Sequence, residues 1–164
     1  MVEPVLLDPA LSRRISPETD PADKQALLNL LRLADATNHV YASLLRPHGL
    51  SQTGLNVLTI LATGPADPRP AWVAERLLLT TGTITTVLDT LERRGLIRRQ
   101  QHPSDRRKVT LSLTRSGRAL VPKVHRELDR FEQALLAALR PTERRTLDRL
   151  LRRLCIHLDE ATAR

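Results

Sequence analysis

Apolar residues recur at helical spacing along most of the chain, and the clearest repeat lies near its middle. A helix is predicted there over residues 81–94, with Thr80 placed to cap its start and Gly95 to end it. One face is apolar at intervals of three and four residues: Ile84, Val87, Leu88 and Leu91. The opposite face carries short polar side chains and a basic end: Thr83, Thr86, Thr90 and Arg94. A narrow helix of this kind suits a DNA major groove, where hydroxyls and thymine methyl groups can both be contacted.

Shorter patterns flank this helix and complete a small module. Residues 71–79 predict a preceding helix, and residues 96–100 and 109–113 predict two strands, the second with alternating apolar and polar positions. The polar loop between the strands carries four charged residues: Asp105, Arg106, Arg107 and Lys108. A helix, a turn, a second helix and a basic hairpin follow one another in a winged helix-turn-helix. The expected fold class is therefore mainly α with a small β-hairpin.

Long amphipathic helices are predicted on both sides of this module. The first spans residues 22–46, and a shorter helix capped by Ser51 follows it. After the second strand, Thr114 caps a helix that reaches about residue 139, and Pro122 within it favours a kink or a displaced start. The last helix begins at Thr142. The first and last helices carry more apolar surface than one small module can cover.

This apolar surplus has two interpretations. One is a bundle within a single chain. The favoured one is an obligate homodimer in which the terminal helices of two subunits interdigitate, because a two-fold protein matches a palindromic DNA operator. The predicted domains are an N-terminal arm at 1–21, a helical dimerisation region at 22–50 and 115–164, and the winged helix-turn-helix at 51–114. The proline-rich arm is either a disordered tail or carries a short helix around residues 9–14.

The charge of the chain is concentrated on the central module. Lys and Arg number 26 against 18 Asp and Glu, a formal net charge of +8. Residues 68–118 alone hold eleven basic and four acidic side chains. A basic surplus on one module is typical of a protein that binds a polyanion. Aromatic residues make up only 2% of the chain, and binding of single strands depends on aromatic stacking, so duplex DNA is the expected partner.

Residues 79–120 resemble the MarR (multiple antibiotic resistance regulator) family of bacterial transcription factors. Three segments carry the resemblance: a helix ending in LERRGLI, a hairpin with Asp105 and Arg107 two residues apart, and LSLTRSGRAL leading into a long helix. Each segment alone is common, but this order and spacing are specific. The resemblance extends over about residues 27–158. It implies a dimeric regulator that binds double-stranded DNA.

The resemblance also implies roles for particular residues. Arg107 would enter the minor groove of the DNA, Asp105 would orient it, and Arg106 and Lys108 would contact phosphates. Thr86 departs from the family pattern, because many relatives carry Arg there. Leu78 departs as well, since it stands where the turn between the helices often has Gly. A solvated charged hairpin is the alternative interpretation of the four hairpin residues.

The start of the central helix supplies the other candidate DNA contacts: Thr81, Gly82, Thr83, Thr85 and Thr86. Thr has a modest helix propensity, so a cluster of threonines there favours contact with bases or phosphates over a face that is merely soluble. Four arginines beyond them are expected either to contact the DNA backbone or to form salt bridges: Arg93, Arg94, Arg98 and Arg99.

A small-molecule effector is expected to act on this regulator. Candidate residues for its pocket are Asn38, His39, Tyr41 and Arg118, although such residues are more often satisfied polar positions at an interface. The five histidines are dispersed without metal-ligand spacing, so neither a metal nor another cofactor is expected. The single cysteine, Cys155, cannot form an internal disulfide, and a buried thiol is favoured over a redox sensor.

Two classes of function remain. The favoured one is a sequence-specific transcriptional regulator, a repressor released when a small molecule changes the spacing of its two DNA-binding modules. The alternative is a sequence-tolerant architectural DNA-binding protein without an effector. An enzyme is not expected, because no nucleophile–base pair, phosphate loop or carboxylate pair stands in a plausible setting. The chain has no signal peptide or membrane-length apolar run, which predicts a cytoplasmic protein.

Overall fold

The computed structural model describes residues 8–65, 68–102 and 105–162, and for residues 102 and 105–108 it describes the backbone alone. The chain forms two compact units, Met1–Val124 and His125–Arg164. Helices predominate, and the two strands form one small antiparallel sheet, as the hydrophobic pattern predicted. Within the described residues, no helix combines the length and the apolar character needed to cross a membrane.

The first unit begins with three helices. The arm contains the short helix α1 (Pro9–Ile15), capped by the carboxylate of Asp8, and α2 (Pro21–Leu45) follows it. A 3₁₀ turn, η1 (Arg46–His48), ends α2 before Gly49, which has a φ of 59°. The next helix is α3 (Gln52–Thr63), whose start is capped as predicted: the hydroxyl of Ser51 accepts a hydrogen bond from the amide of Gly54 at 3.0 Å.

The helix-turn-helix consists of α4 (Pro70–Arg76) and α5 (Thr81–Arg93). The hydroxyl of Thr80 accepts from the amide of Thr83 at 3.2 Å, which confirms the predicted cap of α5. Gly95 has a φ of 66° and ends that helix. The preceding helix is shorter than the predicted 71–79, because Leu78 takes a φ of 53° and a residue in this left-handed conformation cannot continue a helix.

The hairpin is formed by β1 (Ile97–His102) and β2 (Asp105–Leu113). Its strands are longer than predicted, so residues 105–108 lie on β2 and not in a loop between the strands. Polar composition suggested a loop, but the pairing of His102 with Asp105 extends the ladder to the tip. The register is irregular there. Gln101 pairs with Val109 and the next residue, His102, pairs with Asp105, so β2 has three additional residues between these two pairs. Such a bulge bends and twists a strand.

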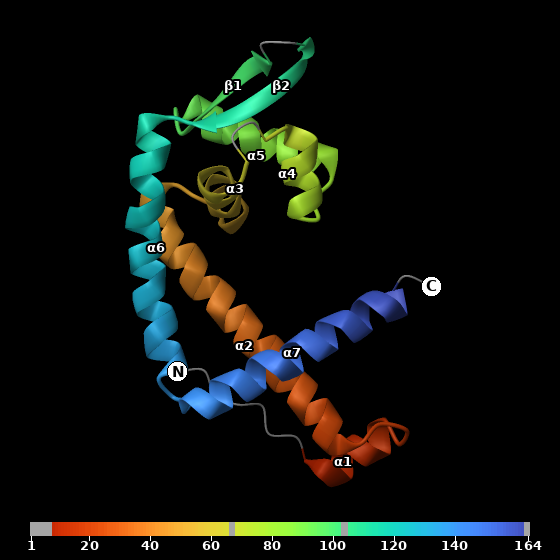
Figure 1. Cartoon of the computed structure of the whole chain (residues 1–164). Coiled ribbons are helices and arrows are strands. Elements are labelled where there is room, and N and C mark those ends of the chain that lie inside the picture. The colour runs from red at the N-terminus through yellow and green to blue at the C-terminus, as the bar shows by residue number, and fades with distance from the viewer. Residues whose placement is uncertain (1–7, 66–67, 103–104, 163–164) are drawn as a thin grey trace. The chain divides into compact units, whose positions relative to one another are not determined.

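The core of the first unit lies where α3, α4 and α5 gather against the hairpin (Figure 1). Its fully buried side chains are apolar and come from each of these elements: Leu55, Val57, Leu58, Val73, Ile84, Leu88, Leu91, Ile97 and Leu111. The carbonyl of Pro68 accepts from the amide of Leu111 at 2.9 Å, which attaches the segment before α4 to β2. The module is thus held by a continuous apolar core and by backbone hydrogen bonds.

Helix α6 (Arg115–Leu136) starts directly after β2. Its first turn is joined to the hairpin by Thr114, whose hydroxyl donates to the carbonyl of Gly95 at 2.7 Å and accepts from the amide of Gly117 at 3.0 Å. Pro122 lies inside the helix, so the expected displacement of the helix start is wrong. Pro122 is the eighth residue of α6, so it cannot donate an amide to the carbonyl of Arg118, and the kink that the sequence favours at this point stays a prediction.

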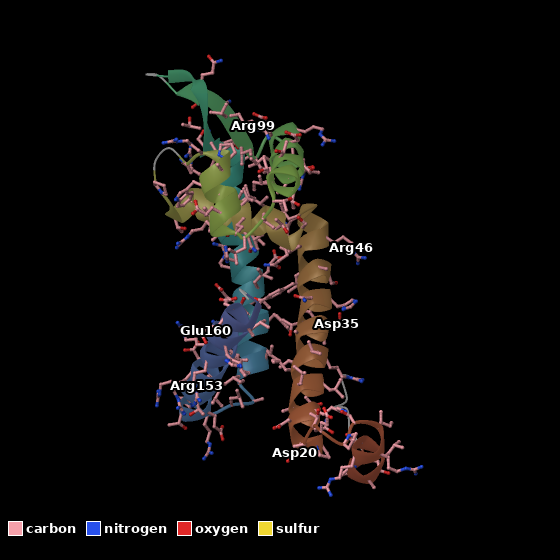
Figure 2. All side chains as sticks on the ribbon, turned by 90° about the vertical axis from the view of Figure 1, so that its right-hand side faces the viewer. Asp20, Asp35, Arg46, Arg99, Arg153 and Glu160 are labelled. Atoms are coloured by element: carbon pink, nitrogen blue, oxygen red, sulfur yellow. The ribbon has the colours of Figure 1, made fainter. Side chains whose placement is uncertain are left out.

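The second unit contains the end of α6 and helix α7 (Pro141–Thr162). Glu143 stabilises the start of α7, since one carboxylate oxygen accepts from the amide of Arg140 at 2.8 Å and the other from its guanidinium at 2.6 Å. These hydrogen bonds lower the pKa of Glu143 and raise that of Arg140. Charged side chains such as Arg153 and Glu160 stand on α7 beside exposed apolar ones (Figure 2).

Candidate nucleic-acid interface

The first two turns of α5 bring the predicted threonine cluster together on the surface. All five positions are exposed: Thr81, Gly82, Thr83, Thr85 and Thr86. The sequence pattern placed Thr83, Thr86, Thr90 and Arg94 opposite the core, and this expectation is right only for Thr86, because the other three lie to one side of the helix. With Ile84, Leu88 and Leu91 buried, the helical geometry places a line of four residues farthest from the core: Gly82, Thr86, Asp89 and Arg93. We call this line the outer face of α5.

The threonine hydroxyls are already used as donors within the helix. Thr85 donates to the carbonyl of Thr81 at 2.8 Å, and Thr86 donates to the carbonyl of Gly82 at 3.1 Å. Thr90 does the same with the carbonyl of Thr86 at 3.0 Å. In this arrangement each hydroxyl oxygen retains acceptor capacity. The exposed threonines of α5 therefore offer acceptors and methyl groups, which suit the amino groups of adenine or cytosine and the methyl group of thymine.

Gly82 has no packing role in the chain itself. A Cβ added at this position would meet no atom within 4 Å, and its φ is not in the left-handed region. Gly in a helix costs about 1 kcal/mol relative to Ala. An unneeded Gly on the outer face leaves room for another molecule to approach the helix backbone closely.

The four candidate arginines take different places. Arg93 and Arg98 are exposed. The guanidinium of Arg94 instead donates to the carbonyl oxygens of His48 and Gly49, which joins the end of α5 to the turn before α3. Arg99 binds two carboxylates of α5, those of Asp89 and Glu92. The carbonyl and carboxylate partners of these two arginines were not found by sequence reasoning, since local spacing does not reveal contacts between distant elements.

The hairpin residues are placed only in part. The backbone of Asp105, Arg106, Arg107 and Lys108 belongs to β2, as described above, but their side chains lie outside the part of the chain that the structure describes. Contact of these side chains with DNA stays a prediction. The base of the hairpin is well attached to the module, because β1 contacts α5 and β2 contacts α3 and α4.

The candidate effector residues lie on two helices. Asn38 and His39 are exposed on α2, Tyr41 is half-buried on the same helix, and Arg118 is exposed on the first turn of α6. The ring of His39 is turned toward its own helix, with Nδ1 at 2.9 Å from the carbonyl oxygen of Asp35 and 3.5 Å from its carboxylate. A common pocket for the four side chains stays a prediction.

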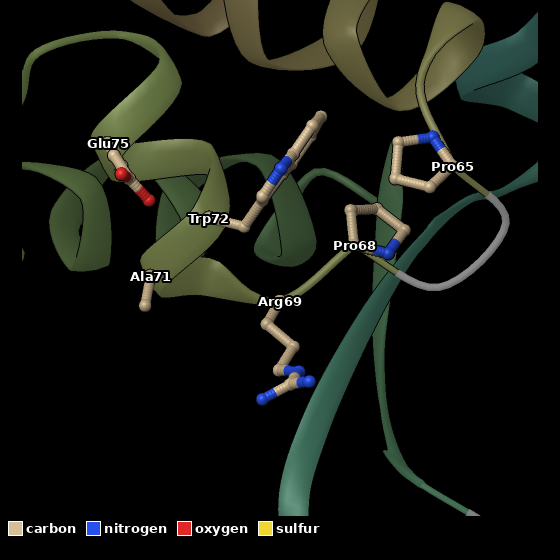
Figure 3. A pocket seen from close by; sticks show the side chains of 6 residues that line it. All are labelled: Pro65, Pro68, Arg69, Ala71, Trp72 and Glu75. Atoms are coloured by element: carbon tan, nitrogen blue, oxygen red, sulfur yellow. The ribbon is translucent and has the colours of Figure 1, made fainter.

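A hollow of about 340 Å³ lies beside the helix-turn-helix, away from the threonine cluster. Figure 3 shows the rings of Pro65 and Pro68 next to the indole of Trp72, with the guanidinium of Arg69 pointing away from the indole. The hollow is open to solvent, and its lining offers one cation and one anion, Arg69 and Glu75. This is a surface depression at the side of α4.

Two further expectations concern Cys155 and metal binding. Cys155 is a free thiol and is exposed on α7, so the expectation that it is buried is wrong for the isolated chain. The sequence shows that α7 is amphipathic, but it does not show which face of this helix is buried by other residues of the same chain. In the part of the chain that the structure describes, no three residues of the types His, Cys, Asp and Glu group into a possible metal site.

Known proteins resemble both the sequence and the fold. The model of the MarR family matches residues 50–109. The uncharacterised HTH-type transcriptional regulator YkoM of Bacillus subtilis (strain 168) is 34% identical over 113 residues, which cover 68% of this chain and 72% of that protein. The HTH-type transcriptional repressor YetL of the same organism is 33% identical over 102 residues, which cover 61% of this chain and 60% of that protein.

A solved structure of a complex of MepR from S. aureus with DNA has a similar fold. The two superpose with a TM-score of 0.73 at 22% sequence identity, over 78% of this chain and 94% of that one. The likeness covers nearly all of that protein, so it extends beyond the helix-turn-helix to the long flanking helices.

Proposed function

The chain belongs to the MarR family of transcriptional regulators, and we propose that it is a dimeric, sequence-specific repressor that binds double-stranded DNA and is released by a small molecule. Proteins of this family are DNA-binding regulators and not enzymes. The observation that carries the proposal is the outer face of α5. It is exposed, it begins with the small residues Gly82 and Thr86, and it lies on a helix whose opposite side is buried in the core.

We propose that α5 enters the major groove with its threonine-rich start. The acceptor oxygens and methyl groups of Thr85 and Thr86 favour A·T pairs or the amino group of cytosine. The Arg that many relatives carry at position 86 would favour guanine, so this chain should prefer a different base there. Arg93 would contact the DNA backbone from the same face.

We propose that the hairpin adds the second DNA contact, as the family resemblance implies. Arg107 would enter the minor groove, with Asp105 as its orienting partner, and Arg106 and Lys108 would contact phosphates. MepR, which has a similar fold, has been solved in complex with DNA, and this supports DNA binding by the present chain.

A second copy of the chain is the proposed partner of the terminal helices. On α7, five apolar side chains are between 37% and 62% exposed: Leu147, Leu150, Leu154, Ile156 and Leu158. Helix α2 exposes Leu27, Leu31 and Leu33 by about half. Exposed apolar residues in such density indicate an interface, and a two-fold dimer would place two copies of α5 on a palindromic operator.

We also propose that the protein represses transcription and that an effector releases it from DNA. YetL is named as a transcriptional repressor, and its similarity to this chain supports repression here. The effector would be a small anionic or phenolic molecule bound near Asn38, His39, Tyr41 and Arg118. It would act by favouring dimers whose two α5 helices no longer match the spacing of the operator.

Selection of bound sequences from random duplex DNA at physiological salt tests the proposal. An inverted repeat with half-sites about one helical turn apart is expected, bound at least roughly a thousandfold more tightly than scrambled DNA. Sedimentation of the same sample should show a dimer. Recovery of no motif, with binding lost at modest salt, would instead support the architectural alternative. Thr83→Ala and Thr86→Ala should change the selected bases, whereas a uniform loss would mean that they contact phosphates alone.

A further inference from the structure

Arg99 on β1 is bound to helix α5 through several hydrogen bonds. Its guanidinium donates to the carboxylate of Glu92 at 3.0 Å and also to that of Asp89. Its backbone amide donates to the other carboxylate oxygen of Glu92 at 2.9 Å. The Arg99 side chain is only 27% exposed, and it lies between the hairpin and the helix (Figure 2). One residue therefore joins the two elements that are proposed to read DNA.

The two carboxylates stand close to the surface that is proposed to face DNA. Asp89 and Glu92 are the only acidic residues of α5, and the side chain of Asp89 is 50% exposed. Asp89 follows Gly82 and Thr86 along the outer face, one turn beyond the threonine cluster. An unpaired carboxylate there would repel the phosphates of bound DNA, and charges in a desolvated interface are weakly screened.

We propose that Arg99 is a positioning residue for DNA binding: it neutralises Asp89 and Glu92 and fixes the angle between α5 and β1. The inference rests on the proposed insertion of α5 into the major groove. It assigns Arg99 a role distinct from that of an arginine that donates to a phosphate. The guanidinium of Arg99 is already committed to the two carboxylates, and its other terminal nitrogen lies 3.5 Å from the carbonyl oxygen of Thr85.

The two roles make opposite predictions for a variant that lacks all three charges. If Arg99 acts through the carboxylates, it becomes dispensable once Asp89 and Glu92 are neutral amides of the same shape. If Arg99 contacts a phosphate directly, its removal weakens DNA binding whether or not the carboxylates are present. A thermodynamic cycle between Arg99 and the acidic pair separates these cases.

The experiment compares four proteins: the natural chain, Arg99→Gln, the pair Asp89→Asn and Glu92→Gln, and the triple variant. Affinity is measured on the operator selected with the natural chain. In the natural chain, Arg99→Gln is expected to weaken DNA binding at least tenfold. In the chain that already carries Asp89→Asn and Glu92→Gln, which we call the neutral background, it is expected to weaken binding less than threefold. Arg98→Gln, on the neighbouring exposed residue of β1, is the matched control and should have the same effect in both backgrounds.

A loss above tenfold for Arg99→Gln in the neutral background would overturn the inference. Melting curves show whether each variant is folded. If Arg99→Gln alone fails to fold, the comparison within the neutral background still decides between the two roles. If the natural chain selects no operator, the proposed function fails and this inference fails with it, whereas a selected operator with a persistent loss contradicts the role of Arg99 alone.

Discussion

The guanidinium of Arg94 donates to the carbonyl oxygen of Gly49 and so fastens the end of α5 to the turn before α3. It donates to the carbonyl of His48 as well. A Cβ at Gly49 would lie 2.9 Å from a nitrogen of this guanidinium, so the turn and the arginine fit closely. Arg93 precedes Arg94 in the chain but lies on the outer face of α5. The two adjacent arginines thus differ in role: Arg94 holds the module together, whereas Arg93 is available to DNA.

Arg94→Ala is expected to lower the free energy of unfolding by about 1–2 kcal/mol, because two carbonyl groups lose a charged donor at a partly solvated site. Urea unfolding measures this. Arg93→Ala is the matched control: it should leave the unfolding free energy within about 0.5 kcal/mol and weaken operator binding instead. Equal losses of stability in the two variants would show that the Arg94 contacts contribute nothing to the fold.

Gly117, in the first turn of α6, is expected to tolerate no side chain. A Cβ there would lie 2.1 Å from the carbonyl oxygen of Leu96, so the helix would have to move away from the hairpin. Gly117→Ala should therefore destabilise the chain by about 1–3 kcal/mol, as overpacked sites do. Ser116→Ala, on an exposed position of the same turn, is the control for helix propensity. Thermal melts that coincide for the two variants would contradict the close approach.

Gly82→Ala is expected to separate stability from DNA binding. The added methyl group meets nothing within 4 Å in the free chain, and Ala is favoured in helices, so the free energy of unfolding should rise by about 0.5–1 kcal/mol. Operator affinity should fall nonetheless if DNA approaches the backbone of α5 closely. Unfolding curves and operator titrations on the same protein samples provide both measurements. A variant that is more stable and binds unchanged would place Gly82 outside the interface.

The elements of the helix-turn-helix could be predicted because their signals are local. Thr80 and Ser51 cap their helices as predicted, since a hydroxyl bonds to an amide only three residues away. The end of α4 was missed because the apolar pattern continues through residues 77–79, although the resemblance marks position 78 as one where the turn often has Gly, the residue that favours the left-handed φ that Leu78 adopts. The extent of the hairpin was missed for a related reason. Residues 105–108 are polar, and their strand structure depends on pairing with β1, which a single segment does not reveal.

The sequence predicted which residues belong to the candidate site, but it did not predict which groups within the chain bind its arginines. The threonine cluster is exposed as expected, because a helix with one apolar stripe must expose the remainder. The roles of the arginines could not be separated in advance: Arg94 reaches carbonyl groups 45 and 46 residues earlier in the chain, and Arg99 reaches carboxylates on another element. Charge counts treat all of them as available to DNA, whereas these two are held by partners within the chain.

Arg107→Ala tests the minor-groove contact that the family resemblance implies. The variant is expected to remain a dimer and to lose about 1–3 kcal/mol of operator binding, because a guanidinium that enters a narrow A·T-rich groove is lost. Fluorescence anisotropy on the selected operator measures the loss. Arg106→Ala is the control and should weaken binding to all sequences alike, as a phosphate contact does.

Base substitutions in the DNA locate the groove that Arg107 enters. A·T pairs opposite the hairpin are replaced by G·C and, separately, by inosine–cytosine, which lacks the guanine amino group in the minor groove. The natural chain should bind the inosine operator nearly as well as the A·T operator and the G·C operator more weakly, because only the guanine amino group obstructs the minor groove. Arg107→Ala should not distinguish the three operators. If the variant retains the full preference, another residue reads this groove.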